Sequence, residues 1–291
     1  MVRYKGKDQI EFGHYAYDEA NYGSSPGAVP LYRVGYVTEL TPIYDPELNR
    51  VFALRGDSDA GKPIAILSRK ENVGLRISWL QGQLGDYWQK FMLGGYNFFA
   101  EAKIYKSDTE KLYILWKGLK ADVLSVRCSI GEPITWSSEL IGKFVDTAAS
   151  TTRTYGSAPG AIWEWDDSYL ESSENDSVWD PIPDVSDYEF RIDNRLKPNF
   201  VFNNAGSKEL ISLEEMEQTC SARITANFTS EKYLEYLLNQ TEVYLRLTLP
   251  SSQWLKLSKG RFRLVEPVLK PEDLIACRLE FEGAYLTHSF T

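Results

Sequence analysis

Residues 22–28 of the chain, Tyr-Gly-Ser-Ser-Pro-Gly-Ala, recur at residues 155–161 as Tyr-Gly-Ser-Ala-Pro-Gly-Ala. Chance recurrence of a Gly/Pro-rich turn could account for this match alone. Three further matches follow in the same order: an Arg-Ile-Ser or Arg-Ile-Thr step inside a strand-like run, a helix-like run, and a late Lys-Gly step. Four matches in one order favour an internal duplication over a chance recurrence.

The first copy predicts a β-rich unit with one helix. Apolar and polar residues alternate in Val73–Leu80, which predicts a half-buried strand. Residues 83–93 have apolar side chains at helical spacing and end at Gly94-Gly95, which predicts a helix and its end. The other strands expected in this unit are Tyr32–Leu40, Val51–Leu54, Ile64–Leu67, Phe98–Tyr105, Leu112–Trp116, Asp122–Ile130 and Ile134–Phe144.

The second copy repeats this order, with a helix expected at Ser230–Asn239. Its expected strands are Tyr188–Asp193, Phe200–Asn203, Ser221–Phe228, Glu242–Leu249, Trp254–Leu257, Arg261–Pro267 and Leu274–Leu286. We therefore predict a mainly β protein with two tandem sandwich or open-barrel units, each with one helix over an edge. The expected organisation is an arm plus first unit at 1–150, an arm-like acidic linker or insertion at 151–187, and a second unit at 188–291. The arms Gln9–Pro30 and Thr151–Ile162 are expected to be extended segments outside the core.

The charge is acidic and unevenly placed. The chain has 32 basic and 41 acidic residues, a net charge of −9. Most of the excess lies in Thr151–Asp187, which has nine acids and one base, Arg153. Such a surface attracts no nucleic-acid phosphate, so tight DNA or RNA binding is not expected. No apolar run is long enough for a membrane helix and none follows the first residues as in a secretory signal, so no membrane partner is expected.

The sequence predicts no catalytic, metal or cofactor site. It has only two histidines, His14 and His288, and its cysteines Cys128, Cys220 and Cys277 are too scattered for a zinc site or a disulfide framework. We expect the cysteines to be buried as small hydrophobic residues. Gly23–Gly27 fits the G-x-S-x-G pattern, but a proline stands where the helix of a nucleophile elbow would begin.

One alternative function arises from Trp163, Trp165 and Tyr169, which lie among acidic residues. Aromatic rings beside carboxylates are typical of sugar-binding clefts. This alternative is a carbohydrate-binding or receptor-binding protein of two β-sandwich domains. The same composition also suits an exposed linker whose tryptophans fix it to a neighbouring surface.

The chain resembles the tail tube proteins of tailed phages and archaeal viruses, and among them the long members with two tube folds in one polypeptide. The opening arm, from Ile10-Glu11-Phe12-Gly13 to Tyr22-Gly23, is similar to the arm that precedes the fold in that family. The order of strand, single helix and strand pairs over Val73–Phe144 and Ser221–Leu286 is also similar. The stretch Cys128–Trp136 resembles the late strand pair of the family.

This resemblance implies a structural subunit with no catalysis and no cofactor. Family members assemble side by side into rings whose inner strands form one β-barrel around a lumen, and the stacked rings let the genome pass. A duplicated chain is expected to form homotrimeric rings with pseudo-sixfold symmetry. The other expected partners are tail terminator, tape-measure and tail-tip proteins, with DNA only in transit, and the place is the virion tail after assembly in the host cytoplasm.

The resemblance also assigns roles to residues. The arms expected to bridge neighbouring subunits or rings contain Tyr22, Gly23, Pro26, Gly27, Tyr155, Gly156, Pro159 and Gly160. The polar face expected on the inner strands contains Arg76, Ser78, Arg223 and Thr225. The two arginines suit a DNA conduit only if nearby acids neutralise them.

Overall fold

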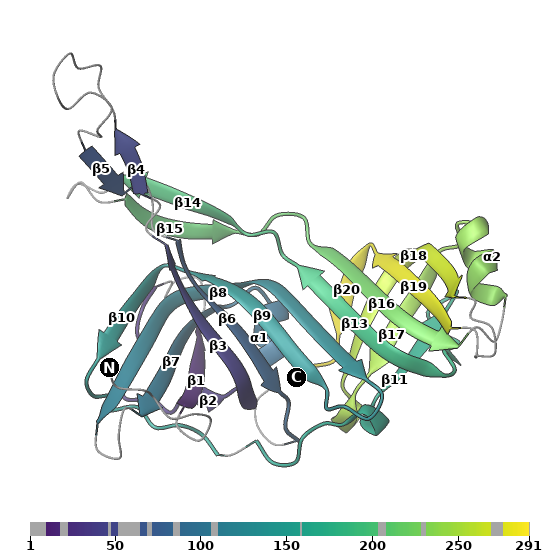
Figure 1. Ribbon diagram of the computed structural model, residues 1–291, viewed down its shortest axis with the longest axis horizontal. Helices are drawn as coiled ribbons and strands as arrows, with labels where there is room; N and C mark the ends of the chain where they lie inside the picture. The colour runs from purple at the N-terminus through teal and green to yellow at the C-terminus, as the bar shows by residue number, and fades with distance from the viewer. Residues whose placement is uncertain are drawn as a thin grey trace.

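The structure is a computed structural model that describes residues 10–17, 23–45, 48–51, 65–68, 72–83, 88–105, 110–157, 159–202, 208–227, 231–268 and 276–290. We call residues 10–148 the first half and residues 169–288 the second half. Figure 1 shows the two halves side by side, with the first half in purple to teal and the second in green to yellow.

The first half contains ten strands and one helix among its described residues. They are β1 (Ile10–Tyr17), β2 (Tyr32–Arg33), β3 (Tyr36–Asp45), β4 (Leu48–Val51), β5 (Ala65–Ser68), β6 (Asn72–Leu80), α1 (Trp88–Leu93), β7 (Asn97–Tyr105), β8 (Lys111–Ser129), β9 (Thr135–Gly142) and β10 (Phe144–Ala148).

The second half and the segment before it contain the remaining elements. They are the short 3-10 turn η2 (Trp165–Asp167), β11 (Tyr169–Ser173), β12 (Asp180–Pro181), β13 (Val185–Asp193), β14 (Lys197–Phe202), β15 (Lys208–Glu214), β16 (Thr219–Asn227), α2 (Lys232–Leu238), β17 (Val243–Thr248), η3 (Pro250–Ser252), β18 (Trp254–Val268), β19 (Ala276–Gly283) and β20 (Tyr285–His288).

One central sheet runs through both halves. Its strands lie in the order β3-β6-β9-β8-β13-β16-β19-β18, and all neighbours are antiparallel. The pair β8–β13 is the joint between the halves. Within the described residues, no strand pairs with the outer edge of β3 or with the outer edge of the second part of β18. The central sheet is therefore open at both edges.

Each half adds an outer sheet through one long strand. The first part of β8 pairs with β7 and β10, and the first part of β18 pairs with β17 and β20. Strand β1 extends the outer sheet next to β7, and β11 does so next to β17. Both long strands turn from outer to central sheet at a residue with left-handed backbone, Gly118 (φ 64) and Lys259 (φ 51). Glycine adopts this conformation without strain, whereas a lysine there is uncommon.

The core lies between the central and outer sheets and is rich in aromatic rings. In the first half, Trp79, Trp88, Trp116 and Trp136 are fully buried. In the second half, Phe262 and Phe281 lie 5.2 Å apart, edge to face, a favourable arrangement of two rings. Both helices pack on this core, because Trp88 of α1 and Tyr236 of α2 belong to its cluster.

The register shifts of one half have counterparts in the other. The ladder of β3 and β6 shifts between Val37 and Glu39, and that of β13 and β16 shifts between Val185 and Asp187. The ladder of β8 and β9 shifts after Ala121, and that of β18 and β19 shifts after Phe262. Aligning these bulges pairs the central-sheet residues of one half with those of the other, a correspondence that we call the bulge alignment.

Several expectations from the sequence differ from the fold. The first arm contains strand β1, in which Phe12 and His14 are buried. The acidic segment contains β11, and Leu170 of this strand is buried. Two pairs of expected strands are each one continuous strand, because the Lys-Gly step between them bends the strand without ending it. Strand β8 contains Leu112–Trp116 and most of Asp122–Ile130, and β18 contains Trp254–Leu257 and Arg261–Pro267. Strand β15 was not expected. The helices begin at Trp88 and Lys232 and end at Leu93 and Leu238.

Candidate assembly surfaces

The joint between the halves is a regular antiparallel ladder. It runs from Asp187 opposite Ser129 to Asp193 opposite Val123. At its two ends the backbone N–H of Ile130 donates to the carbonyl of Ser186 (2.9 Å), and that of Asn194 donates to the carbonyl of Asp122 (2.7 Å). Because hydrogen-bonded pairs alternate in such a ladder, the pair Val126 and Phe190 is also a hydrogen-bonding position.

The two open edges of the central sheet correspond to the two strands of this joint. By the bulge alignment, β3 corresponds to β13 and the second part of β18 corresponds to that of β8. Ile192 of β13 is fully buried, whereas its counterpart Tyr44 on β3 is 56% exposed. Open strand edges with exposed apolar side chains are sites where another strand can pair.

Both open edges contain a proline at the same place in the ladder. Pro42 of β3 corresponds to Phe190, and Pro267 of β18 corresponds to Val126, which is the facing pair of the internal joint. A proline has no N–H to donate, and in sheets it is confined to edges and bulges. The outward-facing backbone of each edge is therefore one donor short.

The polar face of the central sheet contains the four residues that the sequence assigned to it. Arg76 and Ser78 lie on β6, and Arg223 and Thr225 lie on β16, with the buried side chains Ile77 and Ile224 on the opposite face. The structure does not bring Arg76 and Arg223 together, since β9, β8 and β13 separate their strands.

Acidic side chains neutralise both arginines. Arg76 Nε lies 2.8 Å from Glu139 Oε1. Arg223 lies 3.7 Å from both Glu189 and Glu280, and Glu280 also pairs with Arg278 at 2.8 Å. These pairs lie in solvent, so each contributes little to stability. Their effect is to leave the face with charges of both signs in close contact.

The second arm lies against the first half. The N–H of Gly156 donates to the carbonyl of Leu31 (2.9 Å), and the hydroxyl of Tyr36 donates to the carbonyl of Gly160 (2.8 Å). Pro159 is buried against Gly82, where any Cβ would collide with the proline backbone. The arm is thus a fixed extended segment, as expected from its sequence.

The first arm meets the second at Arg153. This guanidinium donates to the carbonyl of Pro26 (2.8 Å) and to the hydroxyl of Ser25 (2.7 Å). Pro26 is buried, whereas Gly27 is exposed, and a Cβ at Gly27 would meet no described atom within 4 Å outside its chain neighbours. Gly23 has a left-handed backbone (φ 77). Tyr22 lies outside the described residues.

A buried carboxylate anchors the second arm. Glu101 of β7 is fully buried, and it accepts from Arg153 (2.9 Å), from the hydroxyl of Tyr155 (2.9 Å) and from Thr151 (3.2 Å). Burial and the charge of Glu101 raise the pKa of Tyr155 far above its ordinary value, so this phenol remains a donor. Sequence reasoning missed this cluster, because no pattern connects residue 101 with residue 153.

The aromatic residues of the alternative binding function do not form a platform. Trp163 is fully buried, so its ring offers no face to a sugar. Trp165 stacks on Tyr188 with ring centroids 5.8 Å apart, and Tyr169 alone of the three is exposed (55%). Trp165 and Tyr169 border one small pocket without Trp163.

The acidic segment is paired with bases of the second half. Glu171 lies 2.7 Å from Arg246, Asp176 lies 2.8 Å from Lys256, and Asp180 lies 2.7 Å from Lys232. The segment is therefore an edge of the outer sheet of the second half, and not only a solvated linker. No local sequence pattern predicts these three pairs, because their partners lie far away in the sequence.

The three cysteines are buried and unpaired, as expected. Burial raises the pKa of Cys128 to about 11 and that of Cys220 to about 12. Burial also raises the pKa of Cys277. Thiols in this state are poor nucleophiles.

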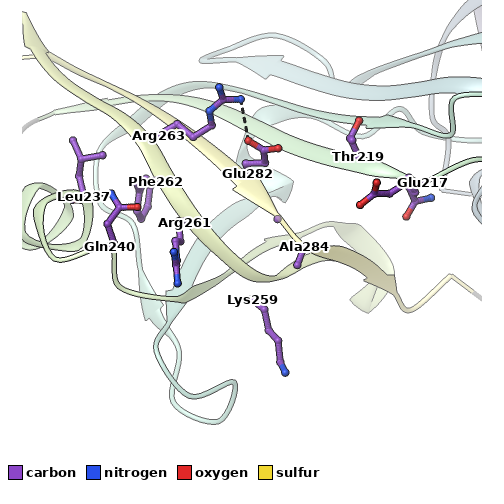
Figure 2. Close-up of a pocket in the computed structure, with 12 residues that line it drawn as sticks. Glu217, Thr219, Leu237, Gln240, Lys259, Arg261, Phe262, Arg263, Glu282 and Ala284 are labelled. Atoms are coloured by element: carbon purple, nitrogen blue, oxygen red, sulfur yellow. Dashed lines mark hydrogen bonds and ion pairs between the residues drawn. The ribbon is translucent and has the colours of Figure 1, made fainter.

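A pocket of about 630 Å³ lies at the outer end of the second half, beside α2 and β18. Figure 2 shows Arg261 and Arg263 on one side of it, with Arg263 paired to Glu282 (2.9 Å) and Gln240 near the end of α2. Polar and charged side chains supply most of its lining.

Within the described residues, no group of three or more acidic, histidine or cysteine side chains is placed to hold a metal ion. None of the described helices has the length and apolar character needed to cross a membrane.

Together these features define a class: a mainly β protein with a central sheet open at both edges and a polar face of paired charges. The family model described as a phage tail tube protein matches residues 76–281, more than two thirds of the chain. The chain therefore belongs to the phage tail tube protein family. It is a structural protein of a virion tail and not an enzyme.

Two solved structures are similar to part of the chain. One is the virion of a native gene transfer agent particle, with 11% identity and a TM-score of 0.35, and the other is the tail of an empty gene transfer agent particle, with 12% identity and a TM-score of 0.36. Each match covers 44% of this chain and 98% of the other chain. No curated protein matches the chain.

Sequence reasoning also missed the two open edges, although a signal for them was present. Pro42 and Pro267 each interrupt a strand-like run, and a proline within such a run indicates an edge strand.

Proposed function

We propose that this chain is a tail tube subunit that pairs with copies of itself, edge to edge, to form a closed ring around a lumen. The two halves are copies of one tube unit, so three chains give a pseudo-sixfold ring. The rings stack into a tube through which DNA passes, and tail terminator, tape-measure and tail-tip proteins are further partners.

The observation that carries this proposal is the ladder between β8 and β13. It is a joint between two tube units of the same pairing order, already made within one chain. The open edges β18 and β3 are the counterparts of its two strands. If the joint repeats between chains, Val265 of one copy lies opposite Tyr44 of the next, as Leu124 lies opposite Ile192.

Burial supports the same arrangement. Tyr188, Phe190 and Ile192 of β13 are almost completely buried, whereas Pro42 and Tyr44 on β3 are exposed. A neighbouring copy on β3 would cover these side chains and pair with the backbone groups of both edges except at the two prolines. Ring closure would remove every open edge of the central sheet, which is how barrels avoid uncontrolled pairing.

In such a ring the polar face of the central sheet lines the lumen. The core and the outer sheets occupy the opposite face, so the polar face is the one left for the inside. Two of its arginines, Arg76 and Arg223, are held by Glu139, Glu189 and Glu280. A lining with neutralised arginines offers no net positive field to a passing phosphate backbone.

The test is negative-stain electron microscopy of the purified chain at rising concentration, with Tyr44→Glu as the edge variant. We expect wild-type rings or hollow tubes with a central pore and three chains per ring. Tyr44→Glu should abolish them, because it would place a charge in the joint. Its free energy of unfolding should stay within about 0.5 kcal/mol of wild type, as for surface substitutions. Tyr285→Glu, at a tyrosine of similar exposure (45%) on β20, is the matched control and should assemble normally.

Two outcomes would contradict the proposal. One is a wild-type chain that stays monomeric at every concentration, including after addition of preformed tail tips. The other is a Tyr44→Glu chain that forms normal rings.

A further inference from the structure

The pocket beside α2 corresponds to a site that is filled in the first half. The bulge alignment pairs Arg261, Arg263 and Glu282 with Lys120, Asp122 and Ile141. Gln240 corresponds to Gly95, since each follows the helix of its half with a left-handed backbone (φ 53 and 69).

In the first half, the segment after β13 covers these positions. The N–H of Leu196 donates to the Asp122 carboxylate (2.8 Å), and Lys120 Nζ donates to the carbonyl of Leu213 (3.5 Å). Lys120 also pairs with Glu215 (3.8 Å), and the Glu215 carboxylate lies where a Cβ on Gly95 would be.

Apolar contacts complete this cover. Leu196, Leu210 and Leu213 form a small buried cluster, and Ile141 of β9 packs against it. The covering segment is the hairpin of β14 and β15, which Figure 1 shows reaching from the second half over the first.

In the second half the same place is open, with a volume of about 630 Å³. The counterpart of the covering hairpin is the one formed by β4 and β5, because it follows β3 as β14 and β15 follow β13. Figure 1 shows β4 and β5 at the opposite end of the molecule from α2, so the hairpin of the same chain does not fill the pocket.

We propose that this pocket receives the β4–β5 hairpin of a second copy of this chain. The proposal rests on the proposed ring and names a second contact of each subunit joint. The ladder registers place the backbone of Leu48 where Leu196 lies, and that of Ile66 where Leu213 lies. Arg261, in the place of Lys120, is then the donor to the hairpin carbonyl at Ile66.

Charge is the main difference between the two sites. Glu215 pairs with Lys120 in the first half, whereas its counterpart on the hairpin is Ser68. The hairpin of the second copy therefore offers Arg261 no carboxylate at this position. The substitution Ser68→Glu would restore the ion pair.

The test is crosslinking between copies under assembly conditions. The variant Leu48→Cys/Arg263→Cys places cysteines at the positions that correspond to Leu196 and Asp122. A short bismaleimide should join copies of this variant into dimers and trimers, seen on a denaturing gel. Each single-cysteine variant is a control for chance collisions, and the native cysteines are buried. The pair Asp122→Cys/Leu196→Cys should crosslink within one chain and give a shifted monomer band only.

A charge series gives an independent measure. We expect Arg261→Glu to raise the concentration needed for rings about tenfold, and Ser68→Glu to lower it at least threefold. Lys90→Glu, on α1, is the matched charge reversal and should leave the concentration unchanged.

The outcomes separate this inference from the ring itself. Two results would overturn the pocket contact but not the proposed ring, provided that the wild type forms normal rings. One is that Leu48→Cys/Arg263→Cys gives no crosslinked oligomer. The other is that the Arg261 and Ser68 variants form rings at the same concentration as the wild type. Absence of rings from the wild type would overturn both.

Discussion

At the residue scale, His14 is a titratable side chain buried in an aromatic core. It is fully buried in the first-half core and stacks on Trp88 with ring centroids 4.9 Å apart. Neither ring nitrogen has a hydrogen-bond partner among the described residues. Burial lowers the pKa of His14 to about 3. The folded chain therefore holds it neutral at every physiological pH.

This burial predicts a loss of stability in acid. Below about pH 6.5 the unfolded chain takes up a proton at His14 and the folded chain does not, so stability falls as the pH falls, down to about pH 3. Between pH 6 and pH 4 the wild type should lose about 2 to 3 kcal/mol more than His14→Phe, at about 1.4 kcal/mol per pH unit. Urea unfolding of both proteins at several pH values measures this difference, and parallel pH profiles would contradict it.

Arg153 is the residue on which the second arm depends. Its partner Glu101 is fully buried, so removing the cation leaves an unpaired charge in the core. Arg153→Met should destabilise the first half by about 3 to 5 kcal/mol, and adding Glu101→Gln should recover part of that loss. Chemical unfolding gives the energies, and limited proteolysis should show cleavage within residues 151–157 in the single variant only. Equal stability of the single and double variants would show that the carboxylate is not the cause.

At the element scale, each edge strand lacks one backbone donor that its internal counterpart has. Pro42 and Pro267 stand where Phe190 and Val126 face each other in the internal joint. Each proline removes one donor from the joint between chains, and a hydrogen bond of this kind contributes about 0.5 to 1.5 kcal/mol. In the proposed ring, the joint between copies is therefore expected to be weaker than the joint within one copy.

We predict that the double variant Pro42→Val/Pro267→Val forms rings at a lower concentration than the wild type. Restoring both donors should lower the concentration at which rings form about tenfold, measured by light scattering and confirmed by microscopy. Pro181→Val, in the short strand β12, is the matched control. A double variant with an unchanged threshold would mean that the prolines do not face each other in the ring.

The sequence was a good guide to elements with a strong local pattern. Alternation located β6 and β16 to within two residues, because each buries one face against the core. It failed at β1, whose inward positions include His14, a residue that pattern reasoning treats as polar. It also failed at β11, where acids such as Glu171 are paired with bases about 75 residues away.

The assembly surfaces were less accessible to sequence reasoning. The polar face follows from alternation, so Arg76 and Arg223 could be assigned to it. The ion pairs that neutralise them depend on strand order, which no local pattern contains. The pocket beside α2 becomes visible only when the two halves are compared in three dimensions.

At the scale of the whole molecule, the polar face makes a prediction about DNA. Replacing Glu139, Glu189 and Glu280 by glutamine would free Arg76, Arg223 and Arg278 from their partners. The triple variant should bind a short DNA duplex at 50 mM salt and release it by 200 mM. The logarithm of its binding constant should fall with the logarithm of the salt concentration with a slope of about −3, as for three phosphate contacts. Fluorescence anisotropy on the unassembled chain measures both.

The wild-type chain is the control and should show no binding at either salt concentration. Equal affinity of the two proteins would mean that the glutamates do not screen the arginines. Binding that is independent of salt would mean that the duplex attaches elsewhere.

The peptide link between the halves has a kinetic consequence. Because β8 and β13 belong to one polypeptide, half of the joints in the proposed ring form at the effective concentration of a tethered pair, independent of how many chains the cell makes. Closing the ring then requires three molecules to meet and not six, so its yield varies with the third power of subunit concentration. In the proposed ring, the peptide link therefore lowers the subunit concentration at which assembly begins, compared with six separate tube units.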